Sequence, residues 1–177
     1  MKTPIIGISV VLLAALLSGC AADEPTVGTI SLAATKSAAQ LQRNTISGQI
    51  SPDITASITR VTDASESCEN DSTRHMRRWR STALTELTPE AASKVTLILK
   101  SIEGTFVSKG WESESEALST DTTLVTLTNP SSLAVIAITA VTNVDGIGMG
   151  ANIYVDIAGP CVMTDGPGSG ELRELGE

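Results

Sequence analysis

Aromatic residues are almost absent from this chain. Trp79, Phe106, Trp111 and Tyr154 are the only four among 177 residues, and they are spread along the sequence. Stacking surfaces for sugars or single-stranded nucleic acid need several clustered aromatic side chains, so such functions are disfavoured. Basic residues are also in deficit, since 12 Lys and Arg stand against 20 Asp and Glu. An acidic chain is a poor general binder of nucleic acid, and we expect none as a partner.

Histidine is equally scarce, because His75 is the only one in the chain. A general base needs a nucleophile and an orienting group beside it, and no nucleophile-elbow pattern or recurring carboxylate motif is present. We therefore predict a surface histidine next to arginine and no enzyme. Distant cysteines and a single histidine also make a poor zinc site, since structural zinc takes four ligands. We expect no metal and no cofactor.

The longest apolar run is too short for a comfortable membrane span, and it ends next to a cysteine. Lys2 precedes about 14 mostly apolar residues, PIIGISVVLLAALL, whereas a ~30 Å hydrocarbon core takes about 20. This is the order of a signal peptide's charged and apolar regions. The junction Leu17-Ser18-Gly19-Cys20 resembles the lipobox of bacterial lipoproteins.

That resemblance implies removal of residues 1–19 and acylation of the Cys20 thiol with diacylglycerol, in the manner of palmitate-type lipidation. Two acyl chains anchor a protein firmly, whereas one holds it only marginally. The lipobox thus predicts a protein held in the cell membrane through the lipid on Cys20, on the extracytoplasmic face. An ordinary transmembrane anchor, or a signal peptide with a chance cysteine, remains the alternative.

The two other cysteines form an even pair once Cys20 carries lipid. In an exported protein, Cys68 and Cys161 therefore indicate one disulfide. We expect it to join the end of the first strand to the end of the last, at one edge of the sheet.

A single domain is expected at 35–163, between a tether at 20–34 and a Gly-rich acidic tail at 164–177 that we predict to be disordered. Apolar spacing predicts helices at 35–50 and 88–109, the second bounded by Thr88-Pro89 and Lys109-Gly110. Alternation and β-branched residues predict six strands, at 54–69, 75–87, 111–118, 122–129, 133–143 and 151–159. The order α-β-β-α-β-β-β-β predicts an α+β two-layer sandwich, with two helices on one face of a mostly antiparallel sheet.

Three short stretches accompany this order: Ser67-Cys68, Arg78-Trp79-Arg80-Ser81 and Gly159-Pro160-Cys161. Together with the lipobox they make most of the mature chain resemble small actinobacterial lipoproteins of unknown function. Arg80 interrupts the Trp-Ser step of that pattern. The resemblance implies an envelope location and a disulfide, and it implies no activity.

Arg74, Arg77, Arg78 and Arg80 are the one basic cluster in an acidic chain. They predict a surface for phosphate headgroups, an anionic cell-wall polymer or an acidic envelope protein. Two structural alternatives stay open. The arginines could protect an edge strand against aggregation, or they could pair across the sheet with the glutamates of the 111–118 strand, Glu112, Glu114 and Glu116.

Other candidate sites are weaker. Carboxylates two residues apart on a strand lie nearly 7 Å apart and do not converge on calcium, so Glu112, Glu114 and Glu116 favour a solvated face. The glycines at 146–150 lie between predicted strands and open no helix, which disfavours a dinucleotide loop.

We therefore predict a non-catalytic binding or interaction module of the cell envelope. The alternative is a carrier of a small apolar ligand or lipid, with the 133–141 strand lining its pocket. A pocket of roughly 300 Å³ or more between sheet and helix would favour the carrier.

Overall fold

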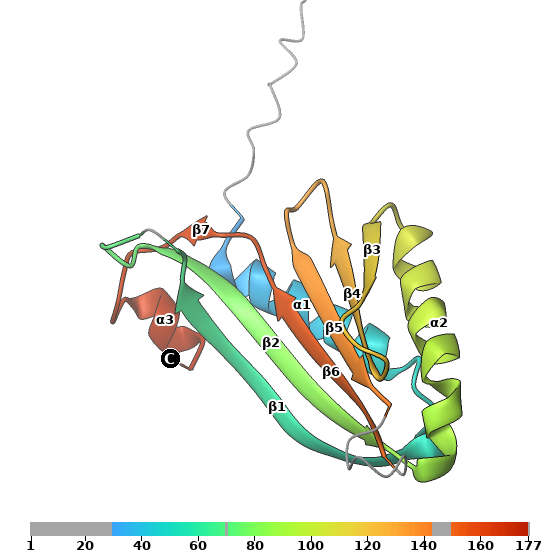
Figure 1. Ribbon diagram of the computed structural model, residues 1–177. Helices are drawn as coiled ribbons and strands as arrows, with labels where there is room; N and C mark the ends of the chain where they lie inside the picture. Colours follow the sequence, from blue (N-terminus) through green and yellow to red (C-terminus); the bar gives the residue numbers. More distant parts are fainter. Residues whose placement is uncertain (1–29, 70, 143–149, 177) are drawn as a thin grey trace, which may run out of the picture.

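The computed structural model describes residues 30–69, 71–142 and 150–176. The lipobox with Cys20, and the glycine-rich stretch at 146–149, lie outside the described residues, so the predictions made for them stay predictions. The described chain contains three α-helices and seven strands, in the order α1, β1, β2, α2, β3 to β7 and α3. Figure 1 shows the sheet with α1 crossing behind it and α2 beside it.

The first helix, α1 (Leu32–Ser47), begins three residues before the predicted start because Ser31 caps it, accepting a hydrogen bond from the Ala34 N–H at 3.2 Å. The predicted tether at 20–34 therefore overlaps the helix. The second helix opens as a 3₁₀ segment, Pro89–Lys94, and continues as α2 (Val95–Val107). Within the described ranges, no helix has both the length and the apolar character that a membrane span requires.

The strands are β1 (Thr55–Ser67), β2 (Met76–Leu87), β3 (Glu112–Ala117), β4 (Thr122–Thr128), β5 (Val135–Val141), β6 (Ala151–Ala158) and β7 (Val162–Met163). They form one seven-stranded sheet in the order β1-β2-β6-β5-β4-β3, with β7 paired to β2. Every pairing is antiparallel. An α+β protein with an antiparallel sheet is thus confirmed, with β7 and α3 added after the last predicted strand.

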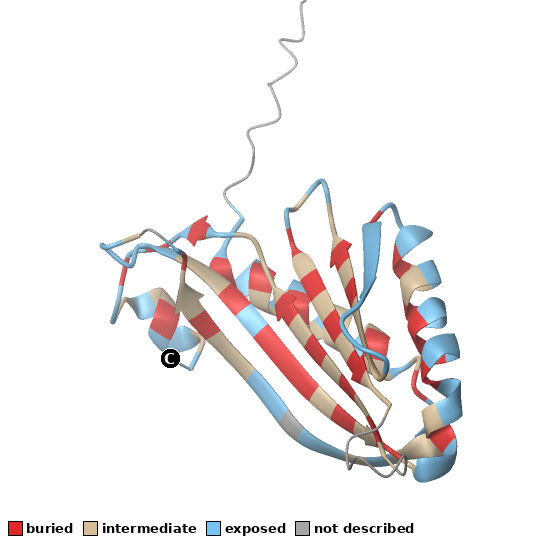
Figure 2. Ribbon diagram, viewed as in Figure 1, coloured by how far each residue is buried: buried red, intermediate tan, exposed pale blue. Residues whose placement is uncertain are grey.

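The core lies on one face of this sheet. Burial alternates residue by residue along β5 and β6, and the register places Ala83, Val155, Ile138 and Val125 in one row. Apolar side chains of α1 and α2 join these residues in a single cluster. On the other face the side chains stay partly exposed, as the alternating bands of Figure 2 show. We call that second surface the open face.

The prediction of a disordered tail is wrong for residues 164–176. Thr164 donates both its N–H (2.8 Å) and its hydroxyl (2.9 Å) to the His75 carbonyl. A short helix, α3 (Gly170–Glu174), follows, and Leu172 is only 4% exposed in the core. Composition favoured disorder, but one buried leucine and a backbone link to the β1–β2 hairpin fix the segment.

The disulfide between Cys68 and Cys161 is confirmed, with Cα atoms 6.2 Å apart. Its surroundings differ from the prediction, because β6 is not an edge strand and β2 separates it from β1. The chain after Pro160 crosses the end of β2 as β7 and so brings Cys161 to the end of β1. The bond therefore closes one end of the sheet rather than one edge.

Replacing Ile138 by Ala removes a fully buried side chain (0% exposed) from the middle of the core. We expect a loss of about 2–5 kcal/mol in the free energy of unfolding, because the sheet and helices cannot collapse around the cavity. The matched control is Leu97→Ala on the outer side of α2, where a 69% exposed side chain should cost about 0.5 kcal/mol or less. Urea unfolding of both variants measures the difference, and equal losses would contradict this assignment of the core.

Candidate functional site

Arg78 and Arg80 lie on the open face and are held by carboxylates. Arg78 Nε donates to Glu66 Oε1 at 2.7 Å, and Arg80 contacts Glu66 at 3.3 Å. The Arg80 guanidinium also makes a two-pronged pair with Asp156, one bond of which is 2.8 Å long. Hydrogen bonding to Asp156 raises the pKa of Arg80 above its ordinary value. Two arginines and two carboxylates thus form a network of balanced charge.

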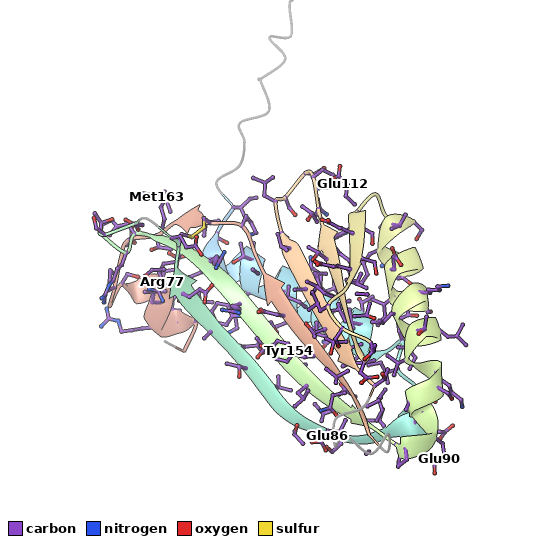
Figure 3. All side chains as sticks on the ribbon, in the orientation of Figure 1. Arg77, Glu86, Glu90, Glu112, Tyr154 and Met163 are labelled. Carbon is purple, nitrogen blue, oxygen red and sulfur yellow. A yellow bond between two sulfur atoms is a disulfide. The ribbon has the colours of Figure 1, made fainter. Side chains whose placement is uncertain are left out.

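The other two arginines of the predicted cluster lie elsewhere. Arg77 shares the helix side of the sheet with Trp79, and its guanidinium donates to the Ser65 hydroxyl (2.8 Å) and carbonyl (3.0 Å). Arg74 is exposed in the β1–β2 turn with a left-handed φ of 60°. The predicted cluster is therefore divided between two faces of the sheet and one turn, and it is not a single basic surface. Figure 3 labels Arg77 at the start of β2.

The order of the strands contradicts both structural alternatives for the arginines. The basic strand β2 is internal, with β1 on one side and β6 on the other, so its charges do not protect an edge. Cross-strand pairing with the glutamates of β3 is excluded because β6, β5 and β4 lie between the two strands. In the described part of the chain no ion pair involves the glutamates of β3, namely Glu112, Glu114 and Glu116.

The open face carries two shallow depressions. One of about 310 Å³ is lined by Arg78, Arg80, Asp156 and the small residues of β5 and β6 beside them. The other, of about 230 Å³, lies between the glutamates of β3 and the threonines of β4. No group of His, Cys, Asp and Glu within the described ranges could hold a metal ion. The face therefore offers hydrogen bonds, charge and small apolar side chains.

A second polar cluster lies on the helix side and fixes the edge strand β1. Arg43 of α1 pairs with Asp63 of β1 and also donates to the Ser81 hydroxyl of β2 at 3.2 Å. Burial raises the pKa of the Asp63 carboxyl, but hydrogen bonds from Ser81 and Arg43, with the charge of Arg43, outweigh it. The pKa of Asp63 is thus lower than its ordinary value. This cluster ties α1 to two strands.

His75 is on the surface, as predicted. Its imidazole lies over Gly166, where a Cβ would come within 2.7 Å of Nε2. Because Gly166 also has a φ of +92°, another residue there would be strained in backbone and in space. The contact with Gly166 thus gives His75 a structural role, because it helps to link the β1–β2 turn to the C-terminal tail.

Among the described residues, two surface depressions lie between the helices and the sheet, near the two ends of α1. One of about 270 Å³ is lined by Ile50, Pro52 and Ile58, and one of about 240 Å³ by Ile30, Ala38 and Pro160 among others. Both are smaller than the roughly 300 Å³ expected of a small-molecule pocket. Side chains with almost no exposure, such as Ile138 and Ile157, fill the space between α1, α2 and the sheet.

Replacing Asp63 by Asn should weaken the link between β1 and α1. The folded-state pKa of Asp63 lies below the unfolded value, near 3.9. Its ionised form therefore stabilises the protein above that pH, and this contribution is lost as the pH falls through the folded pKa. We expect Asp63→Asn to lower the free energy of unfolding by about 1 kcal/mol at neutral pH, because the pair is partly solvated.

Urea unfolding from neutral to acidic pH measures this effect, and the gap between the parent and the variant should narrow below about pH 4. Asp53→Asn, which removes an exposed carboxylate in the 3₁₀ segment before β1, is the control. A gap that stays constant with pH would contradict a role for the ionised carboxylate of Asp63.

Comparison of the chain with protein families, with curated proteins and with solved structures gave no match. The resemblance to small actinobacterial lipoproteins therefore remains a prediction from the sequence. The geometry of the described residues is the remaining basis for assigning a function.

Proposed function

We propose that this protein is a lipid-anchored lipoprotein on the extracytoplasmic face of the cell membrane, and that its domain is a non-catalytic binding module. The observation that carries the proposal is the open face. Across β2, β6, β5, β4 and β3, no described helix covers this side of the sheet. An antiparallel sheet with one solvated side is ordinary, but its side chains are then expected to be mainly polar.

The open face is not mainly polar at its centre. The register aligns Leu84, Tyr154, Thr139 and Leu124 in one row across four strands. The neighbouring row has Ala137 in its middle, and Val135 and Ala158 pair in the row beyond it. Tyr154 lies near the middle of the sheet in Figure 3. Partly exposed small and apolar side chains, with charge at both margins, match the anatomy of a protein interface.

The charges point to a protein partner rather than an anionic polymer. Arg78 and Arg80 are neutralised by Glu66 and Asp156, so this margin attracts polyanions poorly. At the other margin, Glu112, Glu114 and Glu116 are exposed on β3, and none of them forms an ion pair with another described residue. A partner with basic residues opposite β3, and polar or apolar groups opposite β5 and β6, would complement this face.

A carrier of a small apolar ligand or lipid is less well supported. The depressions on the helix side are small and lie at the ends of α1. Opening a larger pocket would require the helices to separate from a core in which Ile102, Ile136 and Ile153 have no exposure.

Cys20→Ser tests the anchor. Because the resemblance assigns the acyl group to this thiol, we expect the variant to lose incorporation of a palmitate analogue and to leave the membrane fraction. Metabolic labelling and fractionation of the producing cells measure both. The control is the double change Cys68→Ala and Cys161→Ala, which removes the two disulfide-bonded cysteines and should leave labelling intact. Labelling that persists in Cys20→Ser would refute the lipid anchor.

Photo-crosslinking in intact envelopes tests the binding face. A photoreactive residue at Thr139, in the middle of the open face, is expected to give an adduct of defined mass. The same residue at Leu97, on the outer side of α2 and 69% exposed, is the matched control and should give none. Adding Thr126→Lys beside the crosslinking position should lower the yield of the adduct about tenfold. A tenfold loss corresponds to about 1.4 kcal/mol of binding free energy. Equal adducts from Thr139 and Leu97 would show that the open face is not a binding surface.

A further inference from the structure

Large apolar side chains are exposed together at one end of the domain. The exposed fractions are 45% for Ile30, 39% for Met76, 71% for Leu133 and 64% for Met163. We call these four residues the apolar end. Single exposed apolar residues are normal, but a group of them marks a contact surface.

The four residues come from separate segments that the fold brings to the same end. Ile30 lines a depression of about 240 Å³ together with Ala134, the neighbour of Leu133, and with Pro160. Met76 and Met163 are direct partners in the pairing of β2 with β7. In Figure 1 the β4–β5 loop, β7 and the start of α1 all lie at the upper end of the sheet, and in Figure 3 Met163 projects outward from β7.

The backbone of Leu133 is held in an unfavourable conformation. Its φ of 58° is in the left-handed region, which a branched apolar residue rarely adopts. The loop is well defined, because the Asn129 side chain accepts hydrogen bonds from the N–H groups of Ser131 and Ser132, both at 3.0 Å. The Leu133 N–H itself donates to the Asn129 carbonyl at 2.8 Å. The fold thus presents an exposed leucine from a strained backbone.

The short stretch of chain between Cys20 and Ile30 indicates which surface lies next to the apolar end. Ile30, the first described residue, belongs to the apolar end and follows Cys20 by ten residues. A chain of that length spans at most about 35 Å. If Cys20 carries the lipid, the apolar end is thereby the part of the domain tethered nearest to the bilayer, where weak contacts act at high effective concentration.

We propose that the apolar end docks on the surface of the membrane, with Ile30, Met76, Leu133 and Met163 entering the interfacial region. This inference rests on the lipid anchor proposed above. Arg74 in the adjoining turn carries no ion pair with a described residue, but Asp71 and Glu69 lie in the same turn. With charges of both signs present, docking depends on apolar insertion and changes little with salt.

The test uses the full lipidated protein in vesicles of phosphatidylcholine and phosphatidylglycerol that contain brominated acyl chains. An environment-sensitive fluorophore is attached through Leu133→Cys or Met163→Cys, and in the controls through Leu41→Cys or Leu97→Cys. The control positions are 68% and 69% exposed on the outer sides of α1 and α2. We expect quenching by the brominated chains to be at least about threefold stronger at positions 133 and 163 than at 41 and 97.

A second variant separates docking from folding. Leu133→Asn suits the left-handed backbone, so it should keep or raise the thermal stability of the protein. Combined with Met163→Gln, it should abolish the quenching of a fluorophore placed through Ile30→Cys, while the protein still floats with the vesicles.

Each other outcome has a definite meaning. If the protein floats with the vesicles but all positions report water, the docking is refuted and the lipid anchor stands. The fluorophores at 133 and 163 could report burial without quenching by bromine, together with energy transfer between protein molecules. In that case a second copy of the protein covers the apolar end, and the membrane proposal fails. If the protein does not float at all, the lipid anchor and the docking fall together.

Discussion

The burial of only one side of the sheet is the constraint on which the rest of this structure depends. Side chains alternate strictly along a strand, so the antiparallel register that aligns Ala83, Val155, Ile138 and Val125 sends the core residues of four strands to one face. Apolar side chains of α1 and α2 join those of the strands in one buried cluster. Any slip of register by one residue would expose the core, which fixes the pairing.

The composition of the open face follows from this constraint. Because no described helix packs on them, the strands of the open face carry leucine, tyrosine, threonine and alanine at the centre and ionised groups toward the margins. Arg80 is placed so that Asp156 on β6 and Glu66 on β1 both reach it. The same network that stabilises the pairing of β1, β2 and β6 therefore removes the net positive charge that a polyanion would require. The margin formed by β3 keeps its negative charge.

The ends of the sheet differ from each other for covalent and topological reasons. At one end, β7 crosses the end of β2, the disulfide joins β1 to the segment after β6, and α3 places Leu172 in the core beside α1. The described part of the chain begins at this end, with Ile30 and the start of α1. If the apolar end rests on a membrane, the strands extend away from the bilayer. The open face then lies to the side of the domain, above the membrane, where another envelope protein can reach this face.

Much of the fold could be predicted from the sequence, because its cause is local. Period-two alternation marked β2 and β6, apolar spacing and Pro89 marked the second helix, and the even pair of cysteines marked the disulfide. The position of the helix start at Leu32 depended on the Ser31 cap, which lay within a stretch that composition assigned to the tether.

What the sequence could not determine depends on contacts between distant residues. Neighbouring arginines look like one patch in a sequence, but alternation sends Arg77 and Arg78 to opposite sides of the sheet, and strand order decides which carboxylates meet them. The order of the residues in the tail gave no sign of the His75 and Leu172 contacts that hold it. The sequence by itself determined the alternation, the helices and the cysteine pair. Only the tertiary structure decided which charges are neutralised and which apolar side chains share one exposed end, because both depend on the pairing of strands far apart in the chain.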